Sequence, residues 1–396
     1  MLNDKTVVLG VPGGIAVYKA ADLASKLTQD GARVKVVMTE AATRFVAPLT
    51  FHTLTHTGVI TDMFTAPTEY NETHISLSEA ADAVVVAPAT ANTIAKITAG
   101  MTDNMLTSIV LATRAPVIIA PAMNVNMWEN PITQENINRL KARGFIIVEP
   151  GYGRLASGKM GYGRLADIEV ILDTIRQVLG GKGDLGGRRL VVTAGGTQEP
   201  VDPVRHIGNR SSGKMGYALA EAARDRGAGV TLISAPTSLP DPAGIEVIHV
   251  QTARQMKEAV AKAVSKADAL IMAAAVADYQ PKSTAKSKIK KDADTMTLEL
   301  VKTPDILAEV QGDFIRVGFA AESEDVVANA RKKLDKKKLD LIIANDITAA
   351  GSGFGADTNK VTIIDKNGKV ENLPLLTKRE VADKILDKVA EILEKT

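Results

Sequence analysis

Short runs of consecutive apolar residues, many of them β-branched, alternate along this chain with stretches in which apolar positions recur every three or four residues. The first run, Thr6–Val11, ends near Gly13 and Gly14 and is followed by helically spaced positions that include Leu23 and Leu27. Continuous apolar runs are typical of strands buried on both faces, and the wider spacing is typical of amphipathic helices. The alternation predicts parallel sheets that bind ligands beyond the carboxyl ends of their strands.

The same alternation occurs twice. Before residue 180, the further strand-like runs are Val34–Thr39, Ala83–Pro88, Val117–Ala120 and Ile146–Val148, with a helical pattern at Asp167–Val178. After residue 187 they are Arg189–Thr193, Val230–Ile233, Ala269–Val276 and Ile342–Asp346, with helical patterns at Met215–Arg226 and after Thr377, where Thr377 and Glu380 form a capping-box pattern. The glycine-rich segment 180–187 has the composition of a flexible linker. Because 396 residues exceed what one core usually supports, we predict two tandem doubly wound α/β domains, 1–179 and 188–396.

Composition narrows the functional classes without selecting one. Apolar residues make up 45% and charged residues 24%, and a formal net charge of +2 gives no reason to expect a nucleic-acid partner. The absence of cysteine excludes disulfides and thiolate chemistry, and the five histidines lack zinc-ligand spacing. No apolar run approaches the roughly 18 residues of a membrane span, and no secretory leader pattern precedes the first strand. We therefore expect a cytoplasmic protein with no membrane partner.

One histidine stands at a predicted helix start. Ser76 and Glu79 have capping-box spacing just before Ala80, and His74 lies two residues upstream of that predicted cap. The positive end of a helix dipole favours the neutral imidazole, which can accept a proton. A partly packed surface histidine is the alternative interpretation.

Two other segments of the first half carry unusual residues after predicted strands. The loop Pro121–Trp128 holds two asparagines, two methionines and the only tryptophan, although packing would also explain the methionines and the tryptophan. The segment 151–164 contains five glycines, which predicts a loop, either a functional flap or a disordered stretch. The strand ending at Pro88 delivers Thr90 and Asn92, small polar residues suited to a ligand's approach.

Neither glycine turn matches a nucleotide fingerprint. The first lacks the G-x-G-x-x-G spacing, which argues against a nicotinamide enzyme. The second, Gly208–Met215 within the stretch Val191–Gly216, fits G-x-x-x-x-G-K but places Met215 where a P-loop has its magnesium-binding serine or threonine. Lysines cluster at 286–291 and 332–338, where a solvated face is the usual explanation, yet Lys333 and Lys337 are spaced to project together toward a polyphosphate.

The chain resembles, over almost its whole length, the bifunctional phosphopantothenoylcysteine decarboxylases and phosphopantothenate-cysteine ligases of coenzyme A synthesis. The resemblance rests on the motifs THISL, PAMNVNMW, AGGTQEPVDPVRHIGNRSSGKMG, AAAVADY, KIKK, KTPDIL, GFAAE and ANDI. It implies a flavodoxin-like flavoprotein domain followed by a Rossmann-like ligase domain.

For the first domain the resemblance implies an FMN-dependent decarboxylase. The flavin oxidises the cysteine thiol of the substrate to a thioaldehyde, carbon dioxide leaves, and the resulting enethiol is reduced to the thiol product. The implied FMN-binding residues are Gly13, Gly14, Thr39, Thr90, Asn92 and Ser108. His74 is implied as the base and Asn124 as the group that holds the substrate carboxylate, with substrate contacts at Met123 and Met127.

The chain departs from the family at Ser157. The family typically has a cysteine there, which donates the proton in the reductive half of the reaction. A serine hydroxyl is a much weaker acid than a thiol, whose pKa is near 8.5, so Lys159, a tyrosine of the glycine-rich segment or water are the alternatives to Ser157 as donor. We still expect the final thiol as product.

For the second domain the resemblance implies a ligase that activates phosphopantothenate as an acyl-nucleotide, using CTP and Mg, before the amine of cysteine attacks. Asn209 is implied to orient that intermediate, and Lys288 to neutralise charge as it forms. The implied nucleotide-binding residues are Ala273, Ala274, Asp278, Lys288, Pro304, Asp305, Ile306, Leu307, Phe319, Lys333 and Lys337. Substrate contacts are implied at Ser212, Gly213 and Lys214, and Asp278 is the candidate metal ligand, with a structural role in its turn as the alternative.

Alternatives from other classes stay open on the residues alone. One is a flavin-dependent decarboxylase with a degenerate, partner-binding second domain, and another is a flavin-binding regulatory scaffold without activity. The resemblance also implies a homo-oligomer, with trimeric flavin domains and dimeric ligase domains in assemblies up to a dodecamer. ATP and CTP are not distinguished by residue chemistry.

Overall fold

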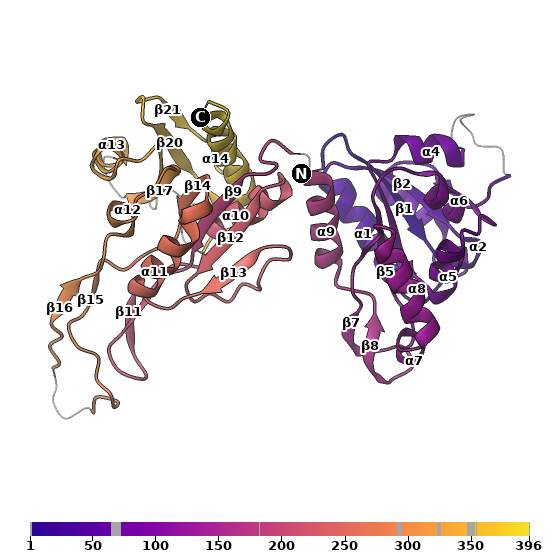
Figure 1. Cartoon of the computed structure of the whole chain (residues 1–396), viewed down its shortest axis with the longest axis horizontal. Coiled ribbons are helices and arrows are strands. Elements are labelled where there is room, and N and C mark those ends of the chain that lie inside the picture. Colours follow the sequence, from indigo (N-terminus) through magenta and orange to yellow (C-terminus); the bar gives the residue numbers. More distant parts are fainter. Residues whose placement is uncertain are drawn as a thin grey trace. The chain divides into compact units, whose positions relative to one another are not determined.

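The chain folds into two α/β units, Met1–Leu179 and Gly180–Thr396, each with its own sheet (Figure 1). The computed structural model describes residues 2–64, 73–181, 183–290, 295–322, 326–346, 353 and 355–395. Lys182 of the predicted linker and Lys291 of the first lysine cluster lie outside these residues. Within them, no helix combines the length and apolar character needed to cross a membrane.

The first unit contains a six-stranded parallel sheet in the order β3-β2-β1-β4-β5-β6. Its strands are β1 (Thr6–Val11), β2 (Arg33–Met38), β3 (Val59–Ile60), β4 (Ala83–Ala89), β5 (Val117–Pro121) and β6 (Ile146–Ile147). Its helices are α1 (Val17–Gln29), α2 (Glu40–Thr43), α3 (Pro48–Thr55), α4 (His74–Ala80), α5 (Ala91–Ala99), α6 (Met105–Ala112), α7 (Val125–Trp128), α8 (Pro131–Ala142) and α9 (Ile168–Gly180). A hairpin of β7 (Gly151–Arg154) and β8 (Met160–Arg164) occupies the predicted loop at 151–164.

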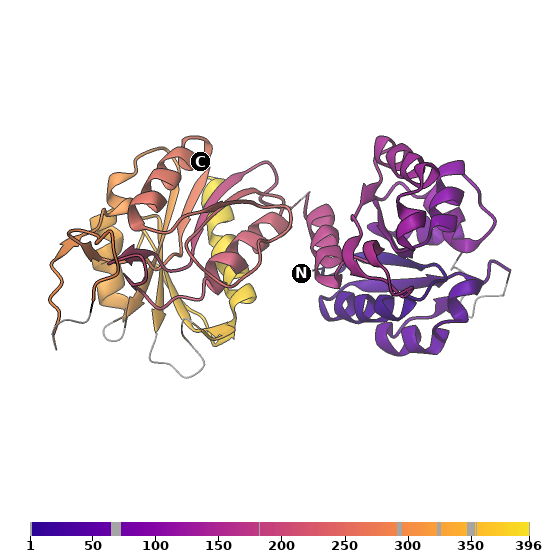
Figure 2. The ribbon, with the colours of Figure 1, turned by 90° about the horizontal axis from the view of Figure 1, so that it is seen from below.

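Helices cover both faces of this sheet, as Figure 2 shows. Successive residues of β1 point to opposite faces: Val7 and Leu9 pack in the core that includes α1, α3 and α9, whereas Val8 packs in the core that includes α5, α6 and α8. Burial on both faces explains why the strands appear in the sequence as continuous apolar runs.

The second unit contains an eight-stranded sheet in the order β13-β12-β9-β14-β17-β18-β20-β21. Its strands are β9 (Arg189–Ala194), β12 (Gly229–Ser234), β13 (Glu246–His249), β14 (Ala269–Met272), β17 (Ile315–Glu322), β18 (Leu341–Asp346), β20 (Val361–Asp365) and β21 (Val370–Asn372). The six strands from β13 to β18 are parallel, and β20 and β21 extend them in antiparallel fashion. The predicted two-domain α/β architecture is therefore confirmed.

The helices of the second unit also lie on both faces of the sheet. They are α10 (Lys214–Asp225), α11 (Ala253–Ala263), α12 (Ile306–Glu309), α13 (Val326–Lys337) and α14 (Lys378–Leu393), with a 3-10 turn at Val264–Lys266. Leu190 and Val192 pack with α10 and α14, whereas Val191 packs in the core that includes α11, α12 and α13. The Thr377 and Glu380 capping box predicted for the last helix is confirmed.

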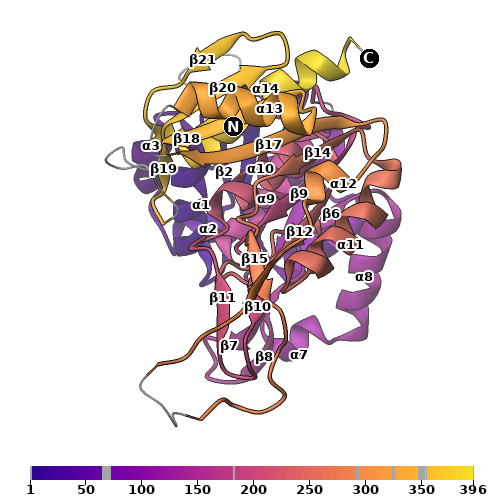
Figure 3. The same ribbon diagram turned by 90° about the vertical axis from the view of Figure 1, so that its left-hand side faces the viewer.

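Three short antiparallel ladders lie outside the main sheet in the described part of the second unit. They are β10 (Gln198–Pro200) with β11 (His206–Gly208), β15 (Tyr279–Pro281) with β16 (Leu300–Lys302), and β19 (Thr358–Asn359) with β22 (Leu376–Thr377). The β15–β16 ladder is the base of an arm that leaves the sheet beside β10 and β11 (Figure 3).

Residues 183–187, part of the predicted linker, pack against the second unit. Leu185 is fully buried in its core, and the Asp184 carboxylate pairs with Arg226 just beyond α10. Gly183 lies so close to the same turn that an added Cβ would be 2.4 Å from the carbonyl oxygen of Arg226.

Candidate functional site

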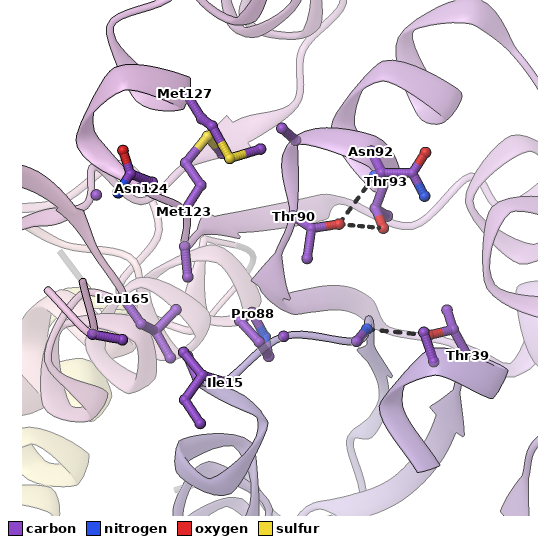
Figure 4. A pocket seen from close by; sticks show the side chains of 18 of the residues that line it. Ile15, Thr39, Pro88, Thr90, Asn92, Thr93, Met123, Asn124, Met127 and Leu165 are labelled. Atoms are coloured by element: carbon purple, nitrogen blue, oxygen red, sulfur yellow. Dashed lines mark hydrogen bonds between the residues drawn. The ribbon is translucent and has the colours of Figure 1, made fainter. Parts of the chain in front are cut away.

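A cavity of about 1030 Å³ opens beyond the carboxyl ends of β1, β2, β4 and β5 in the first unit (Figure 4). Five of the six implied FMN-binding residues line it: Gly13, Gly14, Thr39, Thr90 and Asn92. Met123, Asn124, Met127 and Ser157 line it as well. Ser108 does not. It is buried in α6, and its hydroxyl donates to the carbonyl of Asn104, at 3.0 Å, which does line the cavity.

The floor of this cavity is a fixed set of backbone and hydroxyl groups. Only glycine fits at residue 13, because an added Cβ would lie 2.5 Å from the Cβ of Ala41. The Gly13 amide donates to the Thr39 hydroxyl at 3.2 Å, and the same hydroxyl caps α2. Thr90 caps α5 in the same way, accepting from the Thr93 amide at 3.2 Å. N-terminal caps therefore hold both threonines rigidly at the cavity.

The β7–β8 hairpin forms one wall of the cavity and brings Ser157 to Asn124. The Asn124 side chain caps α7, and its Nδ2 donates to the Ser157 hydroxyl at 3.2 Å. Gly163, at φ 130°, lets the hairpin approach the loop after β5, where the Met123 amide donates to its carbonyl at 2.9 Å. An added Cβ at Gly163 would lie 2.3 Å from the Met123 carbonyl oxygen, so a side chain there would push the hairpin away. Of the glycines in this segment, Gly161 and Gly163 serve close packing.

His74 is the first residue of α4, but the predicted cap is wrong by one turn. Thr73 is the N-cap, and the capping box joins Thr73 with Ser76, whose amide donates to the Thr73 hydroxyl at 3.2 Å. Ser76 therefore acts as the third helical residue, because Thr73 supplies an equally good cap earlier in the chain. The half-buried His74 is not among the residues lining the cavity of its own unit.

Two adjoining cavities lie at the carboxyl edge of the second sheet. The first, about 400 Å³ and here named the loop cavity, is lined by residues 209–216 and by Lys378. The second, about 550 Å³ and here named the lysine cavity, is lined by Lys333 and Lys337 among others. Both are lined by Ala274, Val276 and Phe319, which form a shared wall. The strand predicted over 269–276 is too long: β14 ends at Met272, and the residues that follow line the cavities instead.

The implied ligase residues divide between these cavities. The loop cavity is lined by Asn209, Ser212, Gly213, Lys214 and Ala273. The lysine cavity is lined by Asp278, Pro304, Asp305, Ile306, Leu307, Lys333 and Lys337, and the shared wall includes Ala274 and Phe319. Within the described residues no three histidine or acidic side chains gather to hold a metal, and the carboxylates that line the lysine cavity are the exposed Asp278 and Asp305.

The loop between β9 and α10 is held by close backbone contacts. The Asn209 side chain donates from Nδ2 to the Val276 carbonyl at 2.9 Å, which ties the loop to the shared wall. Gly213, at φ 76°, precedes α10 without any side-chain cap, and an added Cβ at Gly216 would lie 2.6 Å from the Cβ of Ala194. The start of α10 therefore lies directly against β9, with its first amides at the cavity.

Lys288 lies on the β15–β16 arm, is exposed and lines neither cavity. The neighbouring residue fixes this part of the arm: the Ile289 amide donates to the buried Asp202 carboxylate at 3.1 Å, and Arg205 donates to the Ile289 carbonyl at 2.9 Å. Arg205 also pairs with Asp202 at 2.5 Å. The Arg205 hydrogen bonds and nearby amides hold the pKa of Asp202 far below its usual range.

Sequence reasoning missed Lys378, which lines the loop cavity, and Asp357, which pairs with a lysine of that lining. Lys214 pairs with Asp357 at 2.6 Å, and Lys378 is almost fully buried. Neither position carries a motif, because Lys378 simply follows the capping Thr377 at the start of an amphipathic helix.

Comparison with known proteins shows a separate family match for each of the two units. Residues 1–180 match the Flavoprotein family, and residues 185–393 match the family described as DNA/pantothenate metabolism flavoprotein C-terminal domain. Fold and cavities thus define a two-domain α/β flavoprotein. The C-terminal domain of a coenzyme A biosynthesis bifunctional protein, known as a crystal structure, is 41% identical over 54% of this chain and 100% of that one, with a TM-score of 0.47.

Full-length relatives identify the family. The coenzyme A biosynthesis bifunctional protein CoaBC of Bacillus subtilis is 49% identical over 402 residues, covering 100% of this chain and 99% of the relative. Those of Vibrio cholerae and Mycobacterium tuberculosis are each 44% identical, covering 98% of this chain and 99% and 97% of the relatives. The chain belongs to the family of bifunctional coenzyme A biosynthesis proteins, which makes it a bifunctional enzyme with decarboxylase and ligase activities.

Proposed function

We propose that residues 188–396 join phosphopantothenate to cysteine through a CTP-derived acyl-nucleotide, and that residues 1–179 decarboxylate the product with FMN to give phosphopantetheine. The decarboxylase half of this proposal rests on the Asn124 to Ser157 hydrogen bond, which lies in a cavity built from glycine turns and threonine caps. The ligase half is supported by the two cavities of the second unit, which meet at one wall.

The cavity of the first unit fits a flavin mononucleotide. Gly13 provides a cradle that a Cβ would fill, and the threonine-capped helix starts at Thr39 and Thr90 suit a phosphate group. Gly14 and Asn92 would complete the binding site, with Ser108 supporting Asn104 from beneath. Bound flavin supplies the electron sink that decarboxylation of an unactivated amino acid requires.

Within that site Asn124 holds the substrate carboxylate beside Met123 and Met127. His74 acts as the base, and because it does not line its own cavity, it serves the cavity of a neighbouring copy. Its neighbour Ile75 is 47% exposed, and Leu111 of α6 is 62% exposed, which supports a face covered by another subunit. We propose a trimer of flavin domains on this basis.

The Ser157 hydroxyl lies where a proton can reach the product. Lys159, Tyr152 and Tyr162 are not among the residues lining the cavity, and the two tyrosine rings contact each other at 5.2 Å. Ser157, held by Asn124, therefore delivers the proton directly or through a water molecule that it binds.

In the second unit the lysine cavity holds CTP. Lys333 and Lys337 bind the triphosphate, residues 304–307 and Phe319 enclose the base and ribose, and Asp278 contributes to Mg binding together with the phosphates. The arm that carries Lys288 brings its charge to the α-phosphate. A carboxylate oxygen of phosphopantothenate attacks this phosphorus and pyrophosphate leaves.

Phosphopantothenate lies in the loop cavity with its carboxylate at the shared wall. Asn209, tied to Val276, orients the acyl-nucleotide, and the cysteine amine attacks its carbonyl carbon and loses a proton as CMP departs. Ser212, Gly213 and Lys214 contact the acid. Ligase domains pair as dimers in this proposal.

The test is the purified chain with phosphopantothenate, cysteine and Mg, supplied with CTP or ATP in turn. We expect pyrophosphate release with CTP, carbon dioxide release, and phosphopantetheine thiol as the product by mass spectrometry. Carbon dioxide from supplied phosphopantothenoylcysteine without any amide formation would contradict the ligase assignment. Accumulation of the enethiol would contradict the role given to Ser157.

A further inference from the structure

The loop cavity contains a buried lysine with no role in the proposed chemistry. Lys378 is the first residue of α14, is only 6% exposed and lines this cavity. Its Nζ donates to the backbone carbonyls of Gly353, at 3.1 Å, and Ala356. Lysine is almost never buried to this degree unless it is paired with an opposite charge. A buried ammonium group at a cavity wall indicates an anionic ligand.

Among the residues that the structure describes, this ammonium group shares one nearby carboxylate with a second lysine. The Asp357 carboxylate is already paired with Lys214 at 2.6 Å, and this hydrogen bond holds the pKa of Asp357 below its usual range. Two lysines therefore face one carboxylate. Burial, followed by the charge of Lys214, lowers the pKa of Lys378, which an anion bound between the two lysines would counteract.

The start of α10 adds a second favourable feature at the same cavity. This helix of 12 residues begins at Lys214 without a side-chain cap, so its first amides and the positive end of its dipole are available to a ligand. A cavity with two lysines and an uncapped helix start matches a phosphate monoester, which carries up to two negative charges and several acceptor oxygens.

We propose that Lys378 is a specificity-determining residue that binds the phosphate monoester of the acid substrate and so selects phosphopantothenate over pantothenate. This inference rests on the proposed function of the loop cavity as the binding site of the acid. It fixes the orientation of the substrate, with the phosphate at Lys378 and the carboxylate at Asn209 and the shared wall. Lys378 does not line the lysine cavity, so it acts on binding of the acid and leaves nucleotide binding untouched.

A purely structural role is the competing explanation, because Lys378 also ties α14 to the carbonyls of Gly353 and Ala356. The two roles differ in their dependence on the phosphate group. A structural lysine would affect both acids equally, whereas a phosphate-binding lysine affects only the phosphorylated one.

The first experiment compares the full-length enzyme with Lys378→Gln, following cysteine-dependent pyrophosphate release with phosphopantothenate and with pantothenate. We expect the variant to raise KM for phosphopantothenate about 10- to 100-fold, as loss of a charge-assisted hydrogen bond predicts, with kcat, the KM for CTP and the reaction of pantothenate unchanged. Lys384→Gln is the matched control, since Lys384 lies on the same helix with 55% of its side chain exposed. An equal loss with both acids, or an unchanged preference, would overturn the proposal.

The second experiment needs no variant and therefore does not depend on folding. Reductive methylation of the wild-type enzyme with formaldehyde, followed by peptide mass spectrometry, should show Lys378 protected by phosphopantothenate but not by pantothenate. Lys384 should be labelled equally in both samples. Equal protection by the two acids would contradict the inference. Failure of the wild-type enzyme to release pyrophosphate with either acid would instead contradict the proposed function.

Discussion

The first six strands of the two sheets follow the same order, but the cavities at their carboxyl edges differ. In each unit the first strand lies between the second and fourth strands in sequence, β1 between β2 and β4, and β9 between β12 and β14. The cavity of the first unit and the loop cavity of the second unit open near this point, where the order of strands reverses. The first unit needs only residues 12–16 to pass from β1 to α1, whereas the second uses residues 195–213 between β9 and α10. The longer connection includes β10 and β11 and gives the second unit its loop cavity. The longer connection therefore adds residues 209–213 to the cavity lining at this sheet edge.

In both units an ion pair between an arginine and an aspartate links the last helix to the end of the first helix. In the first unit Arg176 of α9 pairs with Asp30 at 2.5 Å, and both side chains are more than a fifth exposed. In the second, Arg379 of α14 pairs with Asp225 at 2.7 Å, and Asp225 is 3% exposed and also pairs with the buried Arg224. The same connection is therefore partly solvated in one unit and buried in the other.

The largest expected effect is a loss of decarboxylation in the first unit that leaves amide formation in the second unit intact. His74→Gln removes the proposed base and should slow carbon dioxide release from phosphopantothenoylcysteine about 10²- to 10⁴-fold. Amide formation in the second unit should not change. Mixing this variant with an Asn124→Ala variant tests the shared site, because a heterotrimer would regain some intact cavities. No recovery on mixing would contradict a base supplied by a neighbouring copy.

Asn209→Ala tests the loop cavity and should have the opposite pattern, with amide formation lost and decarboxylation retained. Amide formation should fall about 10²- to 10³-fold, as for loss of a donor that stabilises developing charge, while CTP-dependent formation of the acyl-nucleotide persists. Quenched-flow mass spectrometry would detect the accumulated intermediate, with carbon dioxide release from supplied substrate as the unchanged control. Equal loss of both ligase steps would show that the loop only shapes the site.

Asp225→Asn and Asp30→Asn compare the two helix connections. Removing the Asp225 charge breaks a buried ion pair with Arg224 and a second pair with Arg379, and should lower the free energy of unfolding of the second unit by about 3–5 kcal/mol. Removing Asp30 breaks a partly exposed pair and should cost the first unit about 1 kcal/mol or less. Hydrogen exchange of peptides from α10 and α14, and from α1 and α9, measures both changes in the full chain. Equal effects would show that burial does not distinguish the two connections.

The smallest effect concerns pH and the arm that carries Lys288. The depressed pKa of Asp202 means that its contribution is present above the ordinary value of about 3.9 and is lost as pH falls below it toward the folded pKa. We expect the arm peptide containing Ile289 to exchange faster at a pH of about 3 than at about 5, after correction for intrinsic rates. Asp202→Asn should exchange fast at both. A pH-independent wild-type arm would contradict this attachment.

Much of the architecture follows from local patterns, and much of the site does not. Apolar runs located β1, β4, β9 and β18 because burial on both faces marks such strands in the sequence. The two-residue β3 and the end of β14 carry no such signal. Ser76 was misplaced in its helix because Thr73 offers a competing cap.

Contacts between distant residues could not be predicted from spacing. Nothing near Lys378 indicates that its amine meets carbonyls more than 20 residues earlier, and nothing near Asn124 indicates Ser157. The glycines of 151–164 predicted a loop, whereas the structure forms a hairpin in which Gly161 and Gly163 allow close approach to the chain after β5.

The wall formed by Ala274, Val276 and Phe319 has a consequence for inhibitor design. The segment 274–276 borders both cavities of the second unit. A fragment bound against it in one cavity can therefore be extended into the other. Fragments from the two cavities can be joined across Ala274 and Val276 into one bisubstrate compound. Such a compound gains affinity from linkage alone, since the second fragment binds at a high effective concentration.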